Sequence, residues 1–254
     1  MGSLPDKAFW DAYARNSAEG EYESLFHNVL WRLLPRERPL AYLEIGCAPG
    51  HDLAYFARRY GYRVSGLDYS RMDLVRAALA HEDVVPERLI EADFTTYESA
   101  ERYDVVASFG LVEHFADPDW AVRRQAAFVR PGGYVVVEVP NLRYVNGLLC
   151  RLFLPRLLAA HNLAAMSPRR LAAALGPDFE ILHCRYRFTC ALFVNARNPF
   201  IADHPGRRRL VRILRWPLER LRLDDVPSRF FSPYILLVAR RRAQAAAGPG
   251  RGPA

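Results

Sequence analysis

Hydrophobic positions in the first 140 residues alternate between short continuous runs and stretches with helical spacing. Five apolar runs predict buried strands, at 41–45, 62–67, 88–92, 103–109 and 134–139. Apolar residues that recur every three or four positions predict helices between them, over 52–60, over 70–81, and from Asp117 or Asp119 to Val129. A breaker, Pro131-Gly132-Gly133, precedes the fifth run. Strands that alternate with helices predict an α/β fold with a parallel sheet and right-handed crossovers.

The pattern changes after the fifth strand. A leucine- and arginine-rich stretch covers 142–166. Ser167 and Pro168 are typical of a helix N-cap and first position, so we expect a helix that ends at Gly176. Two further β-rich runs follow, at 179–188 and 232–240. About forty residues separate them, far more than a hairpin loop needs, so we interpret this segment as an insertion with its own helix.

These boundaries predict one domain over 1–240 with three attached segments. They are an N-terminal helical cap (1–38), a helical segment on the substrate side (141–176) and a basic insertion (190–230). We expect residues 241–254, which end in GPGRGPA, to be a disordered tail. Hydrophobic residues make up 51% of the 254 positions, enough for one sizeable core.

Four cysteines without a Cys-x-x-Cys pair predict reduced thiols rather than a disulfide framework. The most apolar stretch, 147–166, contains charged residues and a proline before it reaches the ~18 apolar residues of a spanning helix. The N-terminus has no basic region followed by an apolar run, the pattern of a secretory signal. We therefore expect a cytoplasmic protein.

The net charge of +7 is concentrated near the C-terminus. Residues 201–254 hold 12 arginines against four acidic residues, whereas residues 1–200 are close to neutral. Within 207–222, arginines alternate with apolar residues that include Trp216. This composition is typical of a helix on a membrane surface, but a packed helix with solvated arginines fits it too. With a neutral remainder and no recognition motif, we do not expect a nucleic-acid partner.

The turn after the first strand carries the strongest chemical signal. It reads Glu44-Ile45-Gly46-Cys47-Ala48-Pro49-Gly50, and Asp68 ends the next strand. Small residues at such a turn let a ligand approach the backbone, and an acidic group about 20 residues later can accept both hydroxyls of a ribose. The turn lacks the G-x-G-x-x-G spacing that brings a helix onto a pyrophosphate. This pattern indicates a nucleoside site without a pyrophosphate.

The motif resembles the class I S-adenosylmethionine-dependent methyltransferases, whose first motif runs acidic-x-Gly-x-Gly-x-Gly. Ala48 replaces the central glycine, a change that the family tolerates. The resemblance covers 40–140 well. It implies a Rossmann-like, mostly parallel seven-stranded sheet with helices on both faces and an antiparallel last strand. It also implies S-adenosyl-L-methionine as cofactor and S-adenosyl-L-homocysteine as product.

The resemblance also implies roles for the residues at successive strand ends. Glu44, Gly46, Cys47, Ala48 and Gly50 would line the methionine part, Asp68 the ribose, Tyr69, Asp93 and Phe94 the adenine, and Phe109 and Gly110 the sulfonium. Each has a structural alternative: Phe94 and Phe109 suit a core, Asp93 a helix cap and Tyr69 the surface.

His114, just past the fourth strand, is a candidate general base for a hydroxyl acceptor, because a neutral imidazole can take a proton near pH 7. The alternative is a helix cap or a packing role. This loop resembles the ubiquinone-biosynthesis O-methyltransferases, in which a Glu-x-x-Glu-His stretch can carry a metal. Gly110 replaces the first glutamate here. Glu113 and His114 are two ligands where a metal site needs three or more, so we expect no metal.

A second group of candidates lies in His161-Asn162 and Met166. This stretch looks like methyltransferases of polysaccharide and natural-product pathways. His161 and Asn162 would contact an acceptor, with Met166 as an apolar wall and His161 as a second candidate base; an ordinary loop fits equally well. Tyr13, upstream of the first strand, is a candidate lid residue, although its helix could simply pack on the sheet edge.

Together these features predict a methyltransferase for a small molecule. The expected reaction is O-methylation of a sugar, a lipid-linked saccharide or a natural-product intermediate. The alternatives are N-methylation and a protein that binds the cofactor without catalysis. The segment 207–222 is the candidate for peripheral membrane contact.

Overall fold

The computed structural model describes residues 24–36, 39–153, 158–188 and 226–243, together with Arg209, Ile213, Trp216 and Arg220. The expectations for Tyr13, for the cap before residue 24, for most of the basic insertion and for the tail after residue 243 lie outside these residues. Within the described part, no helix is long and apolar enough to cross a membrane.

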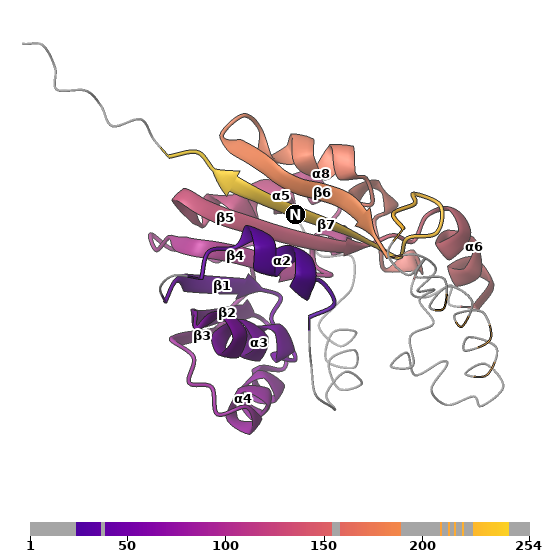
Figure 1. The fold of residues 1–254 in the computed structure, drawn as a ribbon. Helices are drawn as coiled ribbons and strands as arrows, with labels where there is room; N and C mark the ends of the chain where they lie inside the picture. Colours follow the sequence, from indigo (N-terminus) through magenta and orange to yellow (C-terminus); the bar gives the residue numbers. More distant parts are fainter. Residues whose placement is uncertain are drawn as a thin grey trace, which may run out of the picture.

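A seven-stranded sheet forms the centre of the molecule (Figure 1). Its strands are β1 (Ala41–Ile45), β2 (Arg63–Asp68), β3 (Arg88–Glu91), β4 (Tyr103–Phe109), β5 (Val129–Pro140), β6 (Phe179–Arg187) and β7 (Tyr234–Arg241). The order in space is β3-β2-β1-β4-β5-β7-β6. The first five strands are parallel, and β7 runs antiparallel to both of its neighbours. The expected α/β fold with an antiparallel last strand is confirmed.

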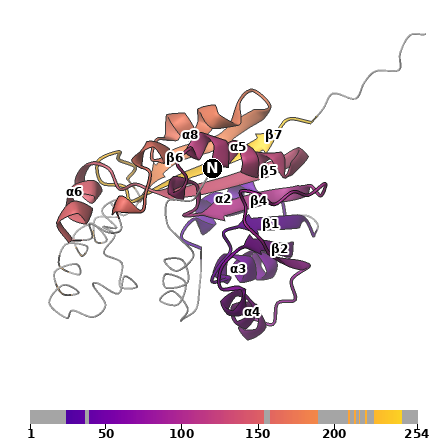
Figure 2. The same cartoon turned by 180° about the vertical axis from the view of Figure 1, so that it is seen from behind.

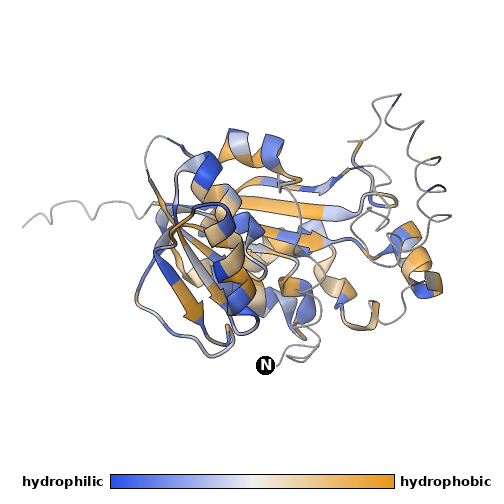
Figure 3. Ribbon diagram, turned by 90° about the horizontal axis from the view of Figure 1, so that it is seen from below, coloured by the Kyte–Doolittle hydropathy of each residue, from blue (hydrophilic) through white to orange (hydrophobic). Residues whose placement is uncertain are grey.

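Helices cover both faces of the sheet (Figures 1 and 2). They are α2 (His27–Leu33), α3 (His51–Tyr60), α4 (Met72–His81), α5 (Pro118–Ala127), α6 (Tyr144–Phe153) and α8 (Pro168–Leu175), with short 3₁₀ turns η1 (Val112–His114) and η2 (Leu163–Ala165). Successive strand residues point to opposite faces. Tyr42 therefore packs with α2, α3 and α4, whereas Leu43 packs with α5 and α8. Because both faces are covered, the central strands β1, β4 and β7 and the second half of β5 are largely buried and apolar (Figure 3).

Two of the differences from the predicted boundaries have a clear physical cause. The helix expected from Ser70 begins at Met72, because the Ser70 side chain bonds to the carboxylate of Asp68 instead of capping the helix. The expected breaker at Pro131-Gly132-Gly133 lies inside β5 as a bulge: Tyr103 pairs with Val129, and the next pair along β4 is Val105 with Tyr134.

The predicted helix ends around α5 and α8 are close to the observed ones. Asp117, not Asp119, caps α5, since its carboxylate accepts a hydrogen bond from the Trp120 N–H at 3.0 Å. This helix ends at Ala127, two residues before the predicted end. Ser167 caps α8 as expected, and the helix stops before Gly176. The three cysteines described, Cys47, Cys150 and Cys184, are free thiols.

We predict that Gly66→Ala destabilises the protein by ~1–3 kcal/mol through overpacking. A Cβ at Gly66 would lie 2.6 Å from Cys47 Sγ and 2.8 Å from Leu53 Cδ1, so strand β2 carries a glycine where the first turn folds against it. Urea unfolding measures the loss. Adding Cys47→Ala should recover part of it, because the sulfur is one of the two obstructing atoms. If the losses in free energy of unfolding of Gly66→Ala and Cys47→Ala simply add in the double variant, contact with the sulfur is not the cause.

Candidate active site

The carboxyl ends of β1, β2, β4 and β5 meet along one edge of the sheet. β1 pairs with β2 on one side and with β4 on the other, so the chain reverses its direction of travel across the sheet at this point. Loops that leave β1 and β4 therefore diverge to opposite faces, and open α/β sheets bind their ligands at such a point. The predicted cofactor residues lie at or just beyond the carboxyl ends of β1, β2, β3 and β4.

The turn after β1 needs its two outer glycines. Gly46 has a φ of 76°, and a Cβ there would lie 3.0 Å from Leu111 Cδ1. Gly50 has a φ of 103°, and a Cβ there would lie 3.1 Å from the backbone of Val75. A side chain would be strained at either position and would also collide with a neighbour. The turn therefore keeps its backbone close to the loop after β4 and to α4.

Asp68 fixes the conformation of this turn. Its Oδ2 accepts a hydrogen bond from the Ala48 N–H at 3.0 Å, and its Oδ1 accepts one from the Ser70 N–H at 2.9 Å. Burial raises the pKa of the Asp68 carboxyl, although these backbone donors act in the opposite direction. A carboxylate has about four lone-pair sites, so it can still accept hydroxyl groups of a ligand. Tyr69 is half-buried beside it.

The remaining predicted cofactor residues have structural roles of their own. Phe94 is buried, with its ring centroid 5.8 Å from that of Phe115. Asp93 is exposed, and its Oδ1 accepts a hydrogen bond from the Thr95 N–H at 2.7 Å, which forms a turn. Phe109 is half-buried against Phe56. These are the packing and turn roles that the sequence left open, and contact with a cofactor stays a prediction.

Three buried glutamates lie in or near these strands. Glu44 is in β1, Glu138 lies beside Phe109 near the end of β5, and Glu113 is in η1. One carboxyl oxygen of Glu113 and one of Glu138 have no hydrogen-bond partner within the protein. Burial raises the pKa of all three carboxyls, that of Glu113 to about 8. Asp52 raises the pKa values of Glu44 and Glu138 further by repulsion.

Such a set of carboxyl groups suits a ligand with positive charge. Burial disfavours the ionised form of each carboxyl group. A cation nearby offsets this penalty, because opposite charge favours the ionised form. The glycine turn supplies close access to backbone, and Asp68 supplies an acceptor for hydroxyl groups. The residues present therefore fit S-adenosylmethionine, which carries a sulfonium, an ammonium group and a ribose.

His114 lies in η1 beside this acidic group. Its Nδ1 donates a hydrogen bond to the Ala160 carbonyl at 2.8 Å, which leaves Nε2 on the side of Glu113, 3.6 Å from Oε1. The ring of His161 lies 4.4 Å away, centroid to centroid. Burial and the neighbouring His161 lower the pKa of His114 to about 3, so its imidazole is neutral at physiological pH and a weak base. The two predicted catalytic histidines therefore form one pair.

The fold brings a third candidate metal ligand to Glu113 and His114, where the sequence predicted two. Ligand atoms of Glu113, His114 and His161 all lie within 4.8 Å of one another, so the loop before α8 supplies a third candidate. Two imidazoles and one carboxylate suit a transition-metal ion better than magnesium, which prefers oxygen ligands. Spacing along the chain could not show this grouping, because His161 lies far from the Glu-His pair in sequence.

Asn162 and Met166 hold this loop in place. The Asn162 amide donates hydrogen bonds to the carbonyls of Phe115 and Ala116 at 3.1 and 3.0 Å, and its Oδ1 accepts one from the Ala164 N–H at 3.0 Å. Met166 is fully buried, and its sulfur lies 3.0 Å from the Leu142 N–H. These contacts position His161 against His114. A direct contact of either residue with an acceptor stays a prediction.

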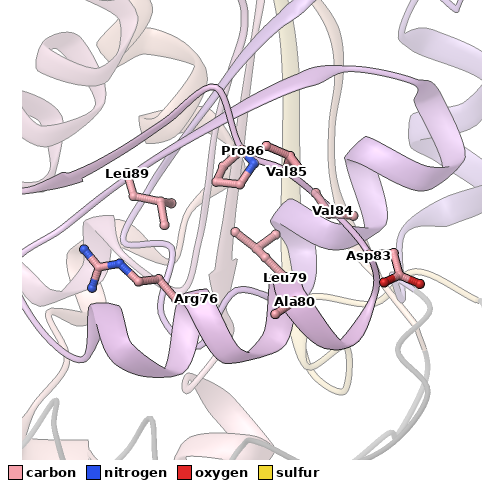
Figure 4. Close-up of a pocket in the computed structure, with 8 residues that line it drawn as sticks. All are labelled: Arg76, Leu79, Ala80, Asp83, Val84, Val85, Pro86 and Leu89. Carbon is pink, nitrogen blue, oxygen red and sulfur yellow. The ribbon is translucent and has the colours of Figure 1, made fainter.

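A surface pocket of about 430 Å³ lies elsewhere, between the end of α4 and the start of β3 (Figure 4). It is lined by Arg76, Leu79, Ala80, Asp83, Val84, Val85, Pro86 and Leu89. This is the amino end of β3, opposite the edge that carries the glycine turn and the histidines. The pocket is therefore separate from the candidate site.

Glu138 is the site residue that the sequence reading missed. It sits in an apolar strand, YVVVEV, and an acidic residue inside a run of valines near a strand's carboxyl end was the available signal. A carboxyl group does not enter a core without a compensating role, because burial of its charged form is costly. Glu138 is a candidate to face the cofactor together with Glu44.

We predict that Glu113→Gln becomes progressively more stable relative to wild type as the pH rises from about 4.5 to about 8. The pKa of Glu113 is raised to about 8, so the unfolded chain ionises first and the wild type loses stability across this window. The gain should be on the order of a few kcal/mol above pH 8. Urea unfolding at several pH values measures it, with Glu91→Gln on exposed β3 as control. A pH-independent difference would show that Glu113 titrates normally.

A family model described as a methyltransferase domain matches residues 17–192, more than half of the chain. A ubiquinone biosynthesis O-methyltransferase from Hydrogenovibrio crunogenus is 30% identical over 174 residues, which cover 60% of this chain and 71% of that protein. A second one, from Proteus mirabilis, is 35% identical over 102 residues, covering 39% and 41%. The chain thus spans well under two thirds of some of the relatives that it matches.

Solved structures of low identity share the fold. The N-methyltransferase NodS from Bradyrhizobium japonicum, in complex with S-adenosyl-L-homocysteine, has a TM-score of 0.55 at 14% identity and covers 93% of this chain and 99% of its own. The mycolic acid cyclopropane synthase CmaA1, with the same product bound, has a TM-score of 0.58 at 15% identity and the same coverage. The family model, the fold and the glycine turn agree. The chain therefore belongs to the class I S-adenosylmethionine-dependent methyltransferases.

Proposed function

We propose that this enzyme methylates a hydroxyl oxygen of a small molecule, of the class of sugars, lipid-linked saccharides or natural-product intermediates. The observation that carries the proposal is the pair of histidines in contact, His114 and His161, whose ring centroids lie 4.4 Å apart beside the buried Glu113. An amine can lose its proton before it reacts, whereas a hydroxyl of high pKa needs a base during methyl transfer.

The cofactor would be held by residues at the ends of β1 and β2. The backbone of Gly46, Cys47 and Gly50 would line its methionine part, Glu44 would face its positive charge and Asp68 would accept the ribose hydroxyls. When bound, the cofactor supplies an electrophilic methyl group. The role of the protein is then to hold the acceptor oxygen in line with that methyl group and to exclude water.

His161 is the stronger candidate for the proton acceptor. Burial lowers the pKa of His114 to about 3, so this ring gains little by accepting a proton from a hydroxyl. His161 is half-buried and lies against His114. We infer that His114, fixed by the Ala160 carbonyl, positions His161, and that His161 removes the acceptor proton.

The curated relatives favour oxygen over nitrogen as the acceptor atom. The relative with 30% identity is a ubiquinone biosynthesis O-methyltransferase. The N-methyltransferase NodS shares only the fold, at 14% identity. N-methylation remains the second candidate. A binding protein without catalysis is the third, and the complete set of Gly46, Gly50 and Asp68 argues against it.

We predict that Asp68→Ala weakens the affinity for S-adenosylmethionine at least about 100-fold. Two charge-assisted hydrogen bonds to the ribose, at ~1.5–3 kcal/mol each, would be lost, and the turn would lose its anchor at Ala48. Calorimetric titration measures the change. Asp73→Ala, at an exposed position of α4, is the matched control and should bind the cofactor with wild-type affinity. An unchanged dissociation constant in a folded Asp68→Ala would mean that another carboxylate holds the ribose.

We predict that His161→Ala slows the chemical step ~10²–10⁴-fold without changing cofactor affinity, because a general base contacts the acceptor rather than the cofactor. Single-turnover transfer of a labelled methyl group to a panel of hydroxyl and amine acceptors, across pH, measures this. His114→Ala removes the other ring of the pair for comparison. A larger loss in His114→Ala would return the role of base to His114, and transfer to amines alone would overturn O-methylation.

We predict that treatment with a chelator leaves the rate of methyl transfer unchanged, because the proposed proton transfer uses His161 directly. Atomic absorption of the purified protein and activity after dialysis against EDTA test this. Loss of activity that manganese or zinc restores would instead assign Glu113, His114 and His161 to a metal centre.

A further inference from the structure

One end of the molecule carries an exposed apolar surface. Helix α6 presents Leu148 and Leu152, with exposed fractions of 58% and 65%, one turn apart. Tyr144, one turn earlier on the same stripe, is 41% exposed. Phe230 and Phe231, in the loop before β7, are exposed as well. We call these five residues the α6 face.

The parts of the α6 face belong to one fixed unit. The ring centroids of Tyr144 and Phe230 lie 5.1 Å apart. The Asn141 amide donates hydrogen bonds to the carbonyls of Arg229 and Ser232 at 3.1 and 2.7 Å, and the Asn146 amide donates one to Ser232 at 3.1 Å. The face therefore does not depend on a chance orientation of one side chain. Two buried asparagines clamp the loop before β7 against α6.

Arginines surround this apolar surface. Arg229 lies 4.6 Å from the ring centroid of Phe230, and Arg143 lies 5.3 Å from that of Tyr144. Arg151 is exposed on α6. The sequence has no aspartate or glutamate between Glu138 and Asp178, nor after residue 225. The segments 139–177 and 226–254 thus carry positive charge and no acidic residue, although Asp224 and Asp225 precede the second one.

The described residues of the basic insertion continue this chemistry. Arg209, Ile213, Trp216 and Arg220 are helical and exposed. Trp216 is 63% exposed.

We propose that the α6 face docks on the surface of an anionic lipid bilayer. Leucines and aromatic rings that enter the interfacial region, flanked by arginines at the level of the head groups, are the composition of a surface-bound segment. A second copy of the chain fits less well, since a symmetric contact would oppose arginines with arginines. The charge complement of the face is an acidic surface, and its exposed leucines and aromatic rings need an apolar layer beneath that surface.

The face also adjoins the acceptor side of the candidate site. The Leu142 N–H contacts the sulfur of Met166, and Arg143 Nη1 lies 3.5 Å from the Met166 carbonyl. Met166 ends the loop that holds His161. Resting on the proposed function, this places the acceptor hydroxyl near the membrane plane and favours an amphiphilic acceptor, such as a saccharide on a lipid carrier, over a fully soluble one.

Vesicle flotation with the full chain tests the docking. At about 50 mM salt we expect the protein to float with vesicles of phosphatidylcholine and phosphatidylglycerol and to stay behind with phosphatidylcholine alone. Each arginine near an anionic surface contributes a factor of about five in affinity, so 0.5 M salt should release the protein. Failure to float with anionic vesicles at low salt would overturn the proposal.

Two variants locate the contact. Leu148→Ser with Leu152→Ser should weaken vesicle affinity at least about tenfold, because two apolar side chains would no longer enter the bilayer. Arg229→Glu should weaken it at least as much. The matched controls are Val85→Ser, at a position 92% exposed near the amino end of β3, and Arg76→Glu on exposed α4. Controls that lose binding equally would show general electrostatic adsorption and remove the α6 face from the proposal.

Other readouts separate this proposal from its alternatives and from the proposed function. Sedimentation that shows a dimer broken by the leucine variants, without flotation, would assign the face to self-association. Specific capture of an acidic protein without flotation would assign it to that partner. Cofactor titration should give the wild-type dissociation constant in every variant. If vesicles bind but no hydroxyl acceptor is methylated, the proposed function fails and the docking stands.

Discussion

The buried carboxyl groups at the carboxyl ends of the parallel strands are the constraint on which the candidate site depends. Burial raises the pKa values of Glu44, Glu113 and Glu138. Repulsion from Glu113 raises the pKa of Glu138 further, and repulsion from Asp52 raises that of Glu44. An apolar replacement would stabilise the empty protein, because the cost of burying these groups would disappear. Their presence is explained by a ligand that brings positive charge, which is the property of a sulfonium cofactor.

Hydrogen bonds between polar side chains and the backbone hold the loops around these carboxyl groups. Asp68 ties the turn after β1 to the end of β2 through Ala48 and Ser70. Asn162 ties the loop before α8 to the loop after β4 through the carbonyls of Phe115 and Ala116. The first link fixes the turn proposed to hold the cofactor, and the second fixes the loop proposed to contact the acceptor. The two loops that carry the chemistry are thus held independently of the ligand.

The histidine pair shows how burial changes the role that a residue type suggests. A histidine past the fourth strand has the right chemistry for a base, but burial lowers the pKa of His114 to about 3. The same ring, fixed by the Ala160 carbonyl, is better suited to hold its partner. The α6 face is the opposite case, since its leucines and aromatic rings are exposed although the protein has a large hydrophobic core.

The sequence by itself determined the fold class, most element boundaries and the cofactor turn, because these depend on local patterns. Apolar runs predicted all seven strands, and Gly46, Gly50 and Asp68 predicted the nucleoside site. Sequence failed where an interaction crossed the chain: Ser70 bonds to Asp68 instead of capping α4, and Pro131-Gly132-Gly133 bulges inside β5.

Only the tertiary structure decided which groups act together. It placed His161 against His114, brought Glu113 to within 4.8 Å of both rings, and assigned Phe94 and Met166 to the core. It also placed Glu138 beside Phe109 at the acidic edge. The physical reason is that hydrophobic periodicity and turn conformation depend on neighbouring residues. Burial depends on side chains from distant parts of the chain, and burial sets the protonation state of a buried group.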